Sequence, residues 1–143
     1  MSNTDIKIEV LLVGKYCEII KGILNVHKHL SVNKTMFFAY LLKIKNNYCQ
    51  WPFKSNTSKD TVFKVISLIS GNYSDYCANI KYIIEAMHLL IENGDVVIQD
   101  TVLLRKDGEI GAEFYDDKLI KNAIEESRNF SDRQFLKEVL SNV

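Results

Sequence analysis

Residues 60–106 constrain the fold most, because they contain a complete series of helix-start, helix-stop and turn signals. Asp60 is an expected N-cap, since its carboxylate accepts hydrogen bonds from the free N–H groups of the following turn. Apolar residues then recur at helical spacing, at Val62, Val65, Ile66 and Ile69. Gly71 and Asn72 end this first helix.

A second helix is expected to begin at the N-cap Ser74 and to end at Asn93 and Gly94. Its apolar stripe is formed by Cys77, Ile80, Ile84, Met87 and Ile91. Two short β-branched runs follow at residues 96–98 and 101–104, and the two residues between them allow only a tight hairpin. A helix-turn-helix followed by a β-hairpin is the pattern of a winged-helix domain.

The length of 143 residues, 47% of them hydrophobic, allows one good core but not two large independent domains. We therefore expect a mainly α-helical, single compact domain over residues 1–143. Its parts would be a winged-helix core over about 33–106, an N-terminal helix over about 5–30 and C-terminal helices over about 114–141. No apolar run approaches the length of a membrane span, and the N-terminus lacks the features of a signal peptide, so we expect a cytoplasmic protein.

The N-terminal segment allows two interpretations. Spacings of four and three residues favour a helix with one apolar face, formed by Ile6, Val10, Val13, Cys17, Ile20 and Leu24. The alternative is a short strand, because Ile6, Ile8, Val10 and Leu12 alternate with other residues. Gly14 would then form a turn.

Residues 35–44 are apolar around most of the helix circumference, so we expect a core helix there that is covered by its own domain or by a partner. The following connection, residues 46–59, holds Trp51, Pro52 and Phe53 among polar residues. Exposed aromatic side chains of this kind are typical of a surface that docks on a partner. Near the C-terminus, Ser131 and Gln134 form a capping box at the start of the last helix.

Cys17, Cys49 and Cys77 are an odd number at wide spacing, which indicates buried, reduced thiols rather than a disulfide framework. His27 and His29 have no closely spaced Cys or His partner of the kind that structural zinc requires. We therefore expect no metal and no cofactor.

The sequence contains none of the motifs that mark common enzyme sites. It has no phosphate-binding glycine loop, no H-E-x-x-H and no G-x-S-x-G. The acidic pairs 116–117 and 125–126 are neighbours in sequence, so their side chains diverge around a helix and do not form a catalytic dyad. We expect a protein that is not an enzyme.

The net charge of zero conceals two halves of opposite sign. Residues 1–64 contain ten Lys against four acidic residues, and residues 65–143 contain eight Lys and Arg against fourteen acidic residues. A basic half suits nucleic acid or an acidic protein surface, and an acidic half repels phosphate. Ordinary solvated faces remain the alternative interpretation.

Charge on the second helix favours protein over DNA as its ligand. Lys81 stands against Asp75, Glu85 and Glu92, a net charge of −2, whereas a helix in the major groove needs basic and amide side chains. Tyr76, Tyr82 and Ile83 give its expected exposed face the aromatic composition of protein interfaces. Three basic residues are possible DNA contacts: Lys81, Arg105 and Lys106.

Residues 80–106, IKYIIEAMHLLIENGDVVIQDTVLLRK, and 131–143, SDRQFLKEVLSNV, resemble the small middle components of bacterial three-component ABC systems, which include the Lamassu-type anti-phage operons. Residues 86–90, AMHLL, match the family's "AL-x-x-L" helix core, and residues 94–97, GDVV, match its "G-x-I/V" hairpin. Residues 20–22, IKG, and the apolar segment 37–44 are similar to the family's opening helix and second apolar stretch.

This resemblance implies an accessory subunit in antiviral defence that assembles with an SMC-like ATPase and a nuclease-type effector from the same operon. ATP binding would belong to the ATPase, and DNA would be reached through the complex, with no membrane and no small-molecule substrate. The expected partner-binding residues are Trp51, Phe53, Tyr76 and Tyr82. The alternative function is a free-standing winged-helix DNA-binding transcriptional regulator.

Overall fold

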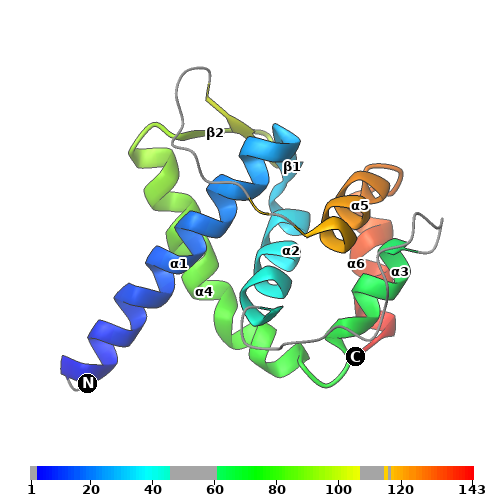
Figure 1. Cartoon of the computed structure of the whole chain (residues 1–143), viewed down its shortest axis with the longest axis horizontal. Coiled ribbons are helices and arrows are strands. Elements are labelled where there is room, and N and C mark those ends of the chain that lie inside the picture. Colours follow the sequence, from blue (N-terminus) through cyan, green and yellow to red (C-terminus); the bar gives the residue numbers. More distant parts are fainter. Residues whose placement is uncertain (1–2, 46–60, 107–114, 116) are drawn as a thin grey trace.

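The computed structural model describes residues 3–45, 61–106, 115 and 117–143. Within these residues the chain is mainly α-helical, with six α-helices, one 3-10 turn and a three-stranded antiparallel sheet (Figure 1). In chain order the elements are α1 (Asn3–His27), β1 (His29–Ser31), α2 (Val32–Lys45), α3 (Thr61–Ile66), the 3-10 turn η1 (Ser67–Ile69), α4 (Tyr73–Glu92), β2 (Val96–Gln99), β3 (Val102–Arg105), α5 (Lys118–Ser127) and α6 (Asp132–Ser141).

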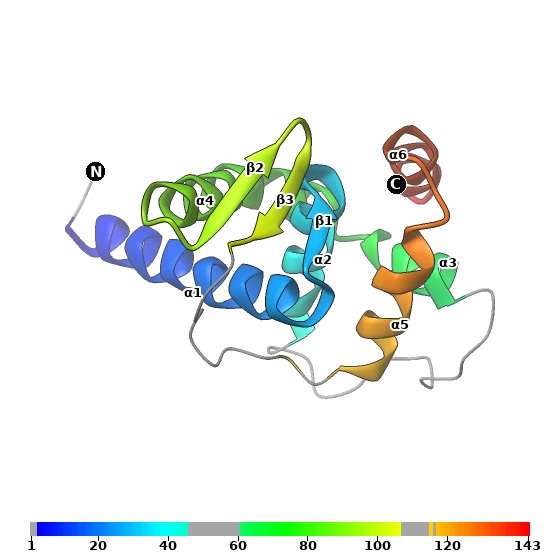
Figure 2. The same ribbon diagram turned by 90° about the horizontal axis from the view of Figure 1, so that it is seen from above.

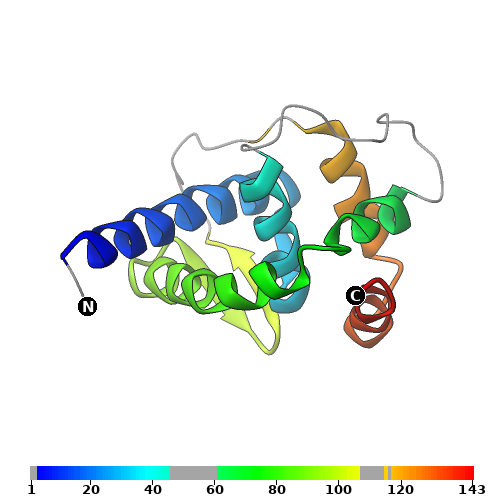
Figure 3. The same cartoon turned by 90° about the horizontal axis from the view of Figure 1, so that it is seen from below.

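The N-terminal segment is a helix, so the alternative strand over residues 6–12 is wrong. Helix α1 ends at His27, and Lys28 takes the left-handed conformation (φ 73°) that closes a helix. Only its C-terminal half packs fully into the core, through Tyr16, Ile20 and Ile23. The other half extends beyond the remaining elements (Figures 1 and 3), which leaves the predicted core residues Ile6 and Val10 47% and 66% exposed.

The sheet has the order β1-β3-β2. The expected hairpin is confirmed, but its turn lies one residue later than predicted, because Gln99 pairs with Val102. Asp100 adopts a φ of 55°, a left-handed conformation that Asp tolerates better than most residues and that a tight hairpin turn needs. Strand β1 pairs with the other edge of β3 and was not predicted.

The helices pack in two groups (Figure 2). Helices α1, α2 and α4 lie together beneath the sheet, and α3, α5 and α6 lie at the other end of the molecule. Helix α3 packs mainly against α5, where Glu126 accepts a hydrogen bond of 3.0 Å from the backbone N–H of Val62. The winged-helix arrangement predicted for residues 60–106 is therefore not confirmed, since α4 packs mainly against α1 and α2.

Helix α2 joins the two groups. Most of its apolar residues are buried by the domain itself, and its phenyl rings meet side chains from both ends of the molecule. The ring of Phe37 lies 5.8 Å from that of Tyr76 on α4 and 5.4 Å from that of Phe135 on α6, both edge to face. The prediction of a core helix at residues 35–44 is confirmed.

Polar side chains close the ends of α5 and α6. Asp117 caps the first turn of α5 by accepting from the N–H of Ile120, and it also pairs with Lys45 of α2. The capping box of Ser131 and Gln134 at the start of α6 is confirmed. Helix α4, in contrast, begins at Tyr73 after Asn72, so the predicted N-cap Ser74 lies inside the helix.

Candidate functional site

Helix α4 carries two neighbouring apolar stripes, and the domain buries the one that was not predicted. The buried stripe contains Tyr76, Ile83, Ala86, Met87 and Leu90. Of the predicted stripe, Met87 alone is fully buried, Cys77 is exposed, and Ile84 is 50% exposed. We call the remaining residues of that stripe, Cys77, Ile80, Ile84 and Ile91, the α4 outer stripe.

The buried stripe of α4 is interrupted by a polar residue, Asn79, and for this reason the sequence favoured the other stripe. Asn79 is buried at the crossing of α1 and α4, where its side-chain oxygen accepts from the hydroxyl of Tyr16 at 2.8 Å. Its amide nitrogen donates to the backbone oxygen of Asp75 at 2.8 Å. Because these bonds satisfy the amide, the helix can bury this face in spite of Asn79.

Three residues of the α4 outer stripe, Cys77, Ile80 and Ile84, line a shallow surface hollow together with residues 78, 79, 81 and 82. Its charged neighbours on the exposed part of α4 are one basic residue, Lys81, and three acidic residues, Asp75, Glu85 and Glu92. Glu92 pairs with His88 at 3.0 Å. The surface is therefore apolar along its centre and acidic in net charge.

Tyr82 and Lys81 lie at the margin of this surface. The Lys81 ammonium sits 4.9 Å from the centre of the Tyr82 ring, and its hydrogen bond with Tyr82 raises the pKa of Lys81. The Tyr82 hydroxyl reaches the carboxylate of Glu9 on α1 at 3.5 Å. Tyr82 is half-buried, so part of its ring is accessible to a partner.

Tyr76 is a core residue, so the expectation that it lies on the exposed face of this helix is wrong. Its ring packs 5.3 Å from that of Tyr40 and 5.8 Å from that of Phe37, and burial raises the pKa of its hydroxyl. Trp51 and Phe53, the other predicted aromatic anchors, lie outside the described residues. Tyr82 is thus the predicted anchor that the structure places at the surface.

The three predicted DNA contacts do not form one basic patch. Lys81 lies on α4 about three helical turns before the end of that helix. Arg105 ends β3, where its N–H donates to the backbone oxygen of Lys28 at 2.9 Å. The Lys106 ammonium lies next to Gly94, just beyond the C-terminal end of α4.

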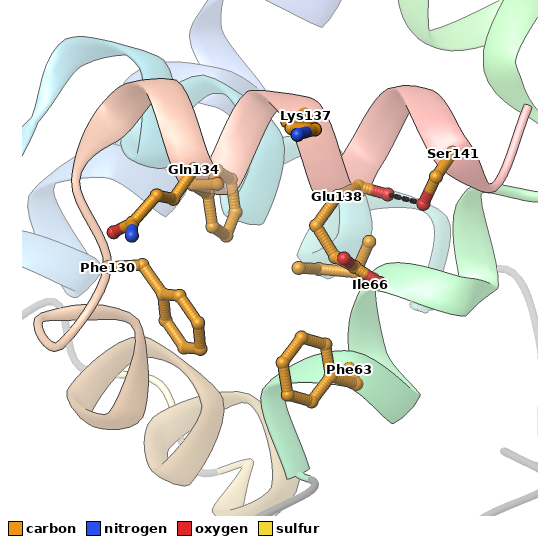
Figure 4. A pocket seen from close by; sticks show the side chains of 8 residues that line it. Phe63, Ile66, Phe130, Gln134, Lys137, Glu138 and Ser141 are labelled. Carbon is orange, nitrogen blue, oxygen red and sulfur yellow. Dashed lines mark hydrogen bonds between the residues drawn. The ribbon is translucent and has the colours of Figure 1, made fainter.

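A second hollow opens between α3 and α6 (Figure 4) and has a volume of about 270 Å³. Phe63 and Ile66 rise from α3, and Gln134 and Glu138 descend from α6 toward the same space. The rings of Phe63 and Phe130 meet edge to face at 5.5 Å. The hollow suits an apolar side chain. The sequence signal that could have predicted it is Phe63, an aromatic residue on the solvent side of the expected helix that begins after Asp60.

A titratable cluster lies where α1, β1 and α5 meet. The buried ring of His27 hydrogen-bonds to Glu125 through Nδ1 and to the Tyr115 hydroxyl through Nε2. Arg128 donates to Glu125 at 3.1 Å and to the backbone oxygens of His27 and His29 at 2.8 and 2.9 Å. Both ring nitrogens of His27 thus have partners within the chain, and the cluster ties α5 to the end of α1.

Cysteine chemistry is limited in the part of the chain that the structure describes. Cys17 is half-buried with its thiol 3.7 Å from the backbone oxygen of Ala86, and Cys77 is exposed, so the prediction of a buried thiol is wrong for Cys77.

No group of three or more His, Cys, Asp and Glu side chains in the described ranges could hold a metal ion. None of the described helices is long and apolar enough to cross a membrane.

Comparisons with protein-family models, with curated proteins and with solved structures found no match for this chain.

Proposed function

We propose that this chain is a non-catalytic, protein-binding subunit with a winged-helix core. The element order α1-β1-α2-α4-β2-β3 and the sheet order β1-β3-β2 support that core, with β2 and β3 as the wing. In this assignment α2 and α4 form the helix pair, since they pack together, and α3 with η1 belongs to the connection between them.

The α4 outer stripe is the observation that carries this proposal. It places the branched side chain of Ile84 on the exposed side of α4, with the half-buried side chains of Ile80 and Ile91 beside it. Helix α4 is the helix that a DNA-reading winged helix would insert into the groove. Apolar side chains that are not surrounded by basic residues suit the desolvated centre of a protein interface. The acidic excess on α4 opposes binding to phosphate.

The proposed partners are those that the family resemblance implies, an SMC-like ATPase and a nuclease-type effector from the same operon. In this role the chain holds the two together and leaves ATP hydrolysis and nuclease chemistry to them. Tyr82, at the margin of the α4 outer stripe, would contribute to the same contact. DNA would be bound by the assembled complex.

Co-expression with the operon neighbours followed by size-exclusion chromatography tests this function. We expect the chain to co-elute with the ATPase or the effector. A chain that elutes without either would overturn the proposal. Salt-dependent binding of duplex DNA by the isolated chain, lost when Lys81, Arg105 and Lys106 are replaced by alanine, would instead support the regulator alternative.

We predict that Ile84→Asp weakens capture of the partner at least about tenfold, because a carboxylate would be buried without a partner at the centre of the interface. Leu89→Asp is the matched control. Leu89 is 43% exposed, close to the 50% of Ile84, and lies on another side of the same helix. Equal binding by the two variants would show that the α4 outer stripe is not the docking surface.

A further inference from the structure

The N-terminal half of α1 carries apolar side chains on several sides. It extends out of the domain (Figures 1 and 3). Four of its residues are strongly exposed: Ile6 (47%), Ile8 (57%), Val10 (66%) and Leu11 (73%). Exposed apolar side chains that gather on one segment often mark a protein interaction site. These four side chains are exposed in the part of the chain that the structure describes, so they are available to a second polypeptide.

The side of α1 that faces away from the core carries a regular seam. Lys7, Leu11, Gly14 and Glu18 follow one another at intervals of four, three and four residues, the spacing that places side chains in one line along a helix. All four residues are exposed. A Cβ atom added to Gly14 would meet no atom within 4 Å, so the seam is open at its centre.

This seam is complementary to itself when two copies run antiparallel. Lys7 of one copy then faces Glu18 of the second, and Leu11 faces Gly14, where the absent side chain leaves room for it. Two-fold symmetry repeats each contact. Ile8 and Val10 flank the seam and would be partly covered by the second helix.

Two other arrangements of the same helices set like charges against each other. A parallel pair places Lys7 on Lys7 and Glu18 on Glu18. An antiparallel pair centred on Leu11 places Lys7 against Lys15. Exposed ion pairs add little affinity but help to select the register and orientation of an interface, so the charges favour the Lys7–Glu18 pairing over these two arrangements.

We infer that this chain forms an antiparallel homodimer through the Lys7-Leu11-Gly14-Glu18 seam of α1, with a second copy as the occupant of the exposed helix face. The seam extends over about 16 Å of helix. Because core packing begins near Val13 and the preceding residues project, the two domains lie at opposite ends of the paired helices. The α4 outer stripe is not part of this contact, and the inference does not rest on the proposed function.

Sedimentation velocity of the isolated full chain over a concentration series tests the inference. We expect a reversible dimer, and we expect Glu18→Lys to weaken it about tenfold, since each Lys7 then faces a lysine. Lys7→Glu should have the same effect. The double variant Lys7→Glu with Glu18→Lys should restore the dimer, because the two pairs are re-formed with reversed charges.

Leu11→Asp should abolish the dimer, and Leu140→Asp on α6 is its control, since Leu140 is also exposed (57%) and lies outside the seam. Circular dichroism would show that each variant keeps its helical content. A monomer at every concentration would overturn the inference. A dimer that Glu18→Lys does not weaken, or that the double variant does not restore, would do so as well.

Discussion

Replacing Lys34 by methionine is expected to lower the free energy of unfolding by about 3 kcal/mol, because two charge-assisted hydrogen bonds are lost. The Lys34 ammonium donates to the backbone oxygen of Ser127 at 2.7 Å and to that of Phe130 at 2.6 Å. These oxygens belong to the end of α5 and the turn into α6, and Ser127 is fully buried. Methionine keeps most of the side-chain length but leaves both oxygens without this donor.

Urea unfolding at neutral pH measures this loss, and Lys43→Met is the matched control. Lys43 lies on the same helix and is half-buried, so its replacement should change the free energy of unfolding by less than about 0.5 kcal/mol. Equal unfolding midpoints for the two variants would contradict the role assigned to Lys34. In the Lys34→Met variant, amide exchange should accelerate most in α6, because the corner that holds it is released.

Local signals were sufficient where the structure depends on neighbouring residues in the sequence. The capping box at Ser131 and Gln134, the helix at residues 35–44 and the hairpin of β2 and β3 all depend on interactions within a few residues. Strand β1 lacks such a signal. It has three residues, and its pairing with β3 more than 70 positions away defines it.

Long-range packing decided the features that the sequence did not predict. Helix α4 has two apolar stripes, and the buried amide of Asn79 could be recognised as satisfied only once Tyr16 of α1 was placed beside it. The same exchange of stripes buried Tyr76 and exposed Ile84. Helix α1 has a continuous apolar pattern, but Ile6 and Val10 lie in the part of the helix that the core does not reach. Periodicity therefore predicted the helix but not which of its residues are buried.

The free energy of unfolding is expected to fall as the pH decreases below about 6.5, the usual pKa of histidine, because of His27. Burial lowers the pKa of His27 in the folded chain, and the charges of Arg128 and Lys121 lower it further, against the opposing effect of Glu125. Between the usual pKa and this lowered value, the unfolded chain binds a proton that the folded chain does not. Acid therefore favours unfolding in this range.

Glu125 acts in a separate, more acidic range. Burial raises the pKa of its carboxyl, but the hydrogen bonds from His27 and Arg128 outweigh burial and the net shift is downward. Its contribution to stability is present above the usual carboxyl pKa of about 4.3 and is lost as the pH falls further. Unfolding measured between about pH 5 and 7 therefore separates the effect of His27 from that of Glu125.

His27→Gln should remove the dependence on pH in this range, since glutamine does not titrate. It should also lower the free energy of unfolding at pH 7 by about 2 kcal/mol, because the buried bonds to Glu125 and Tyr115 are not both retained. His88→Gln, at an exposed position on α4, should keep the dependence of the unmodified chain. A decrease in stability from pH 7 to 5 that is as large in His27→Gln as in His88→Gln would assign the proton uptake to another group.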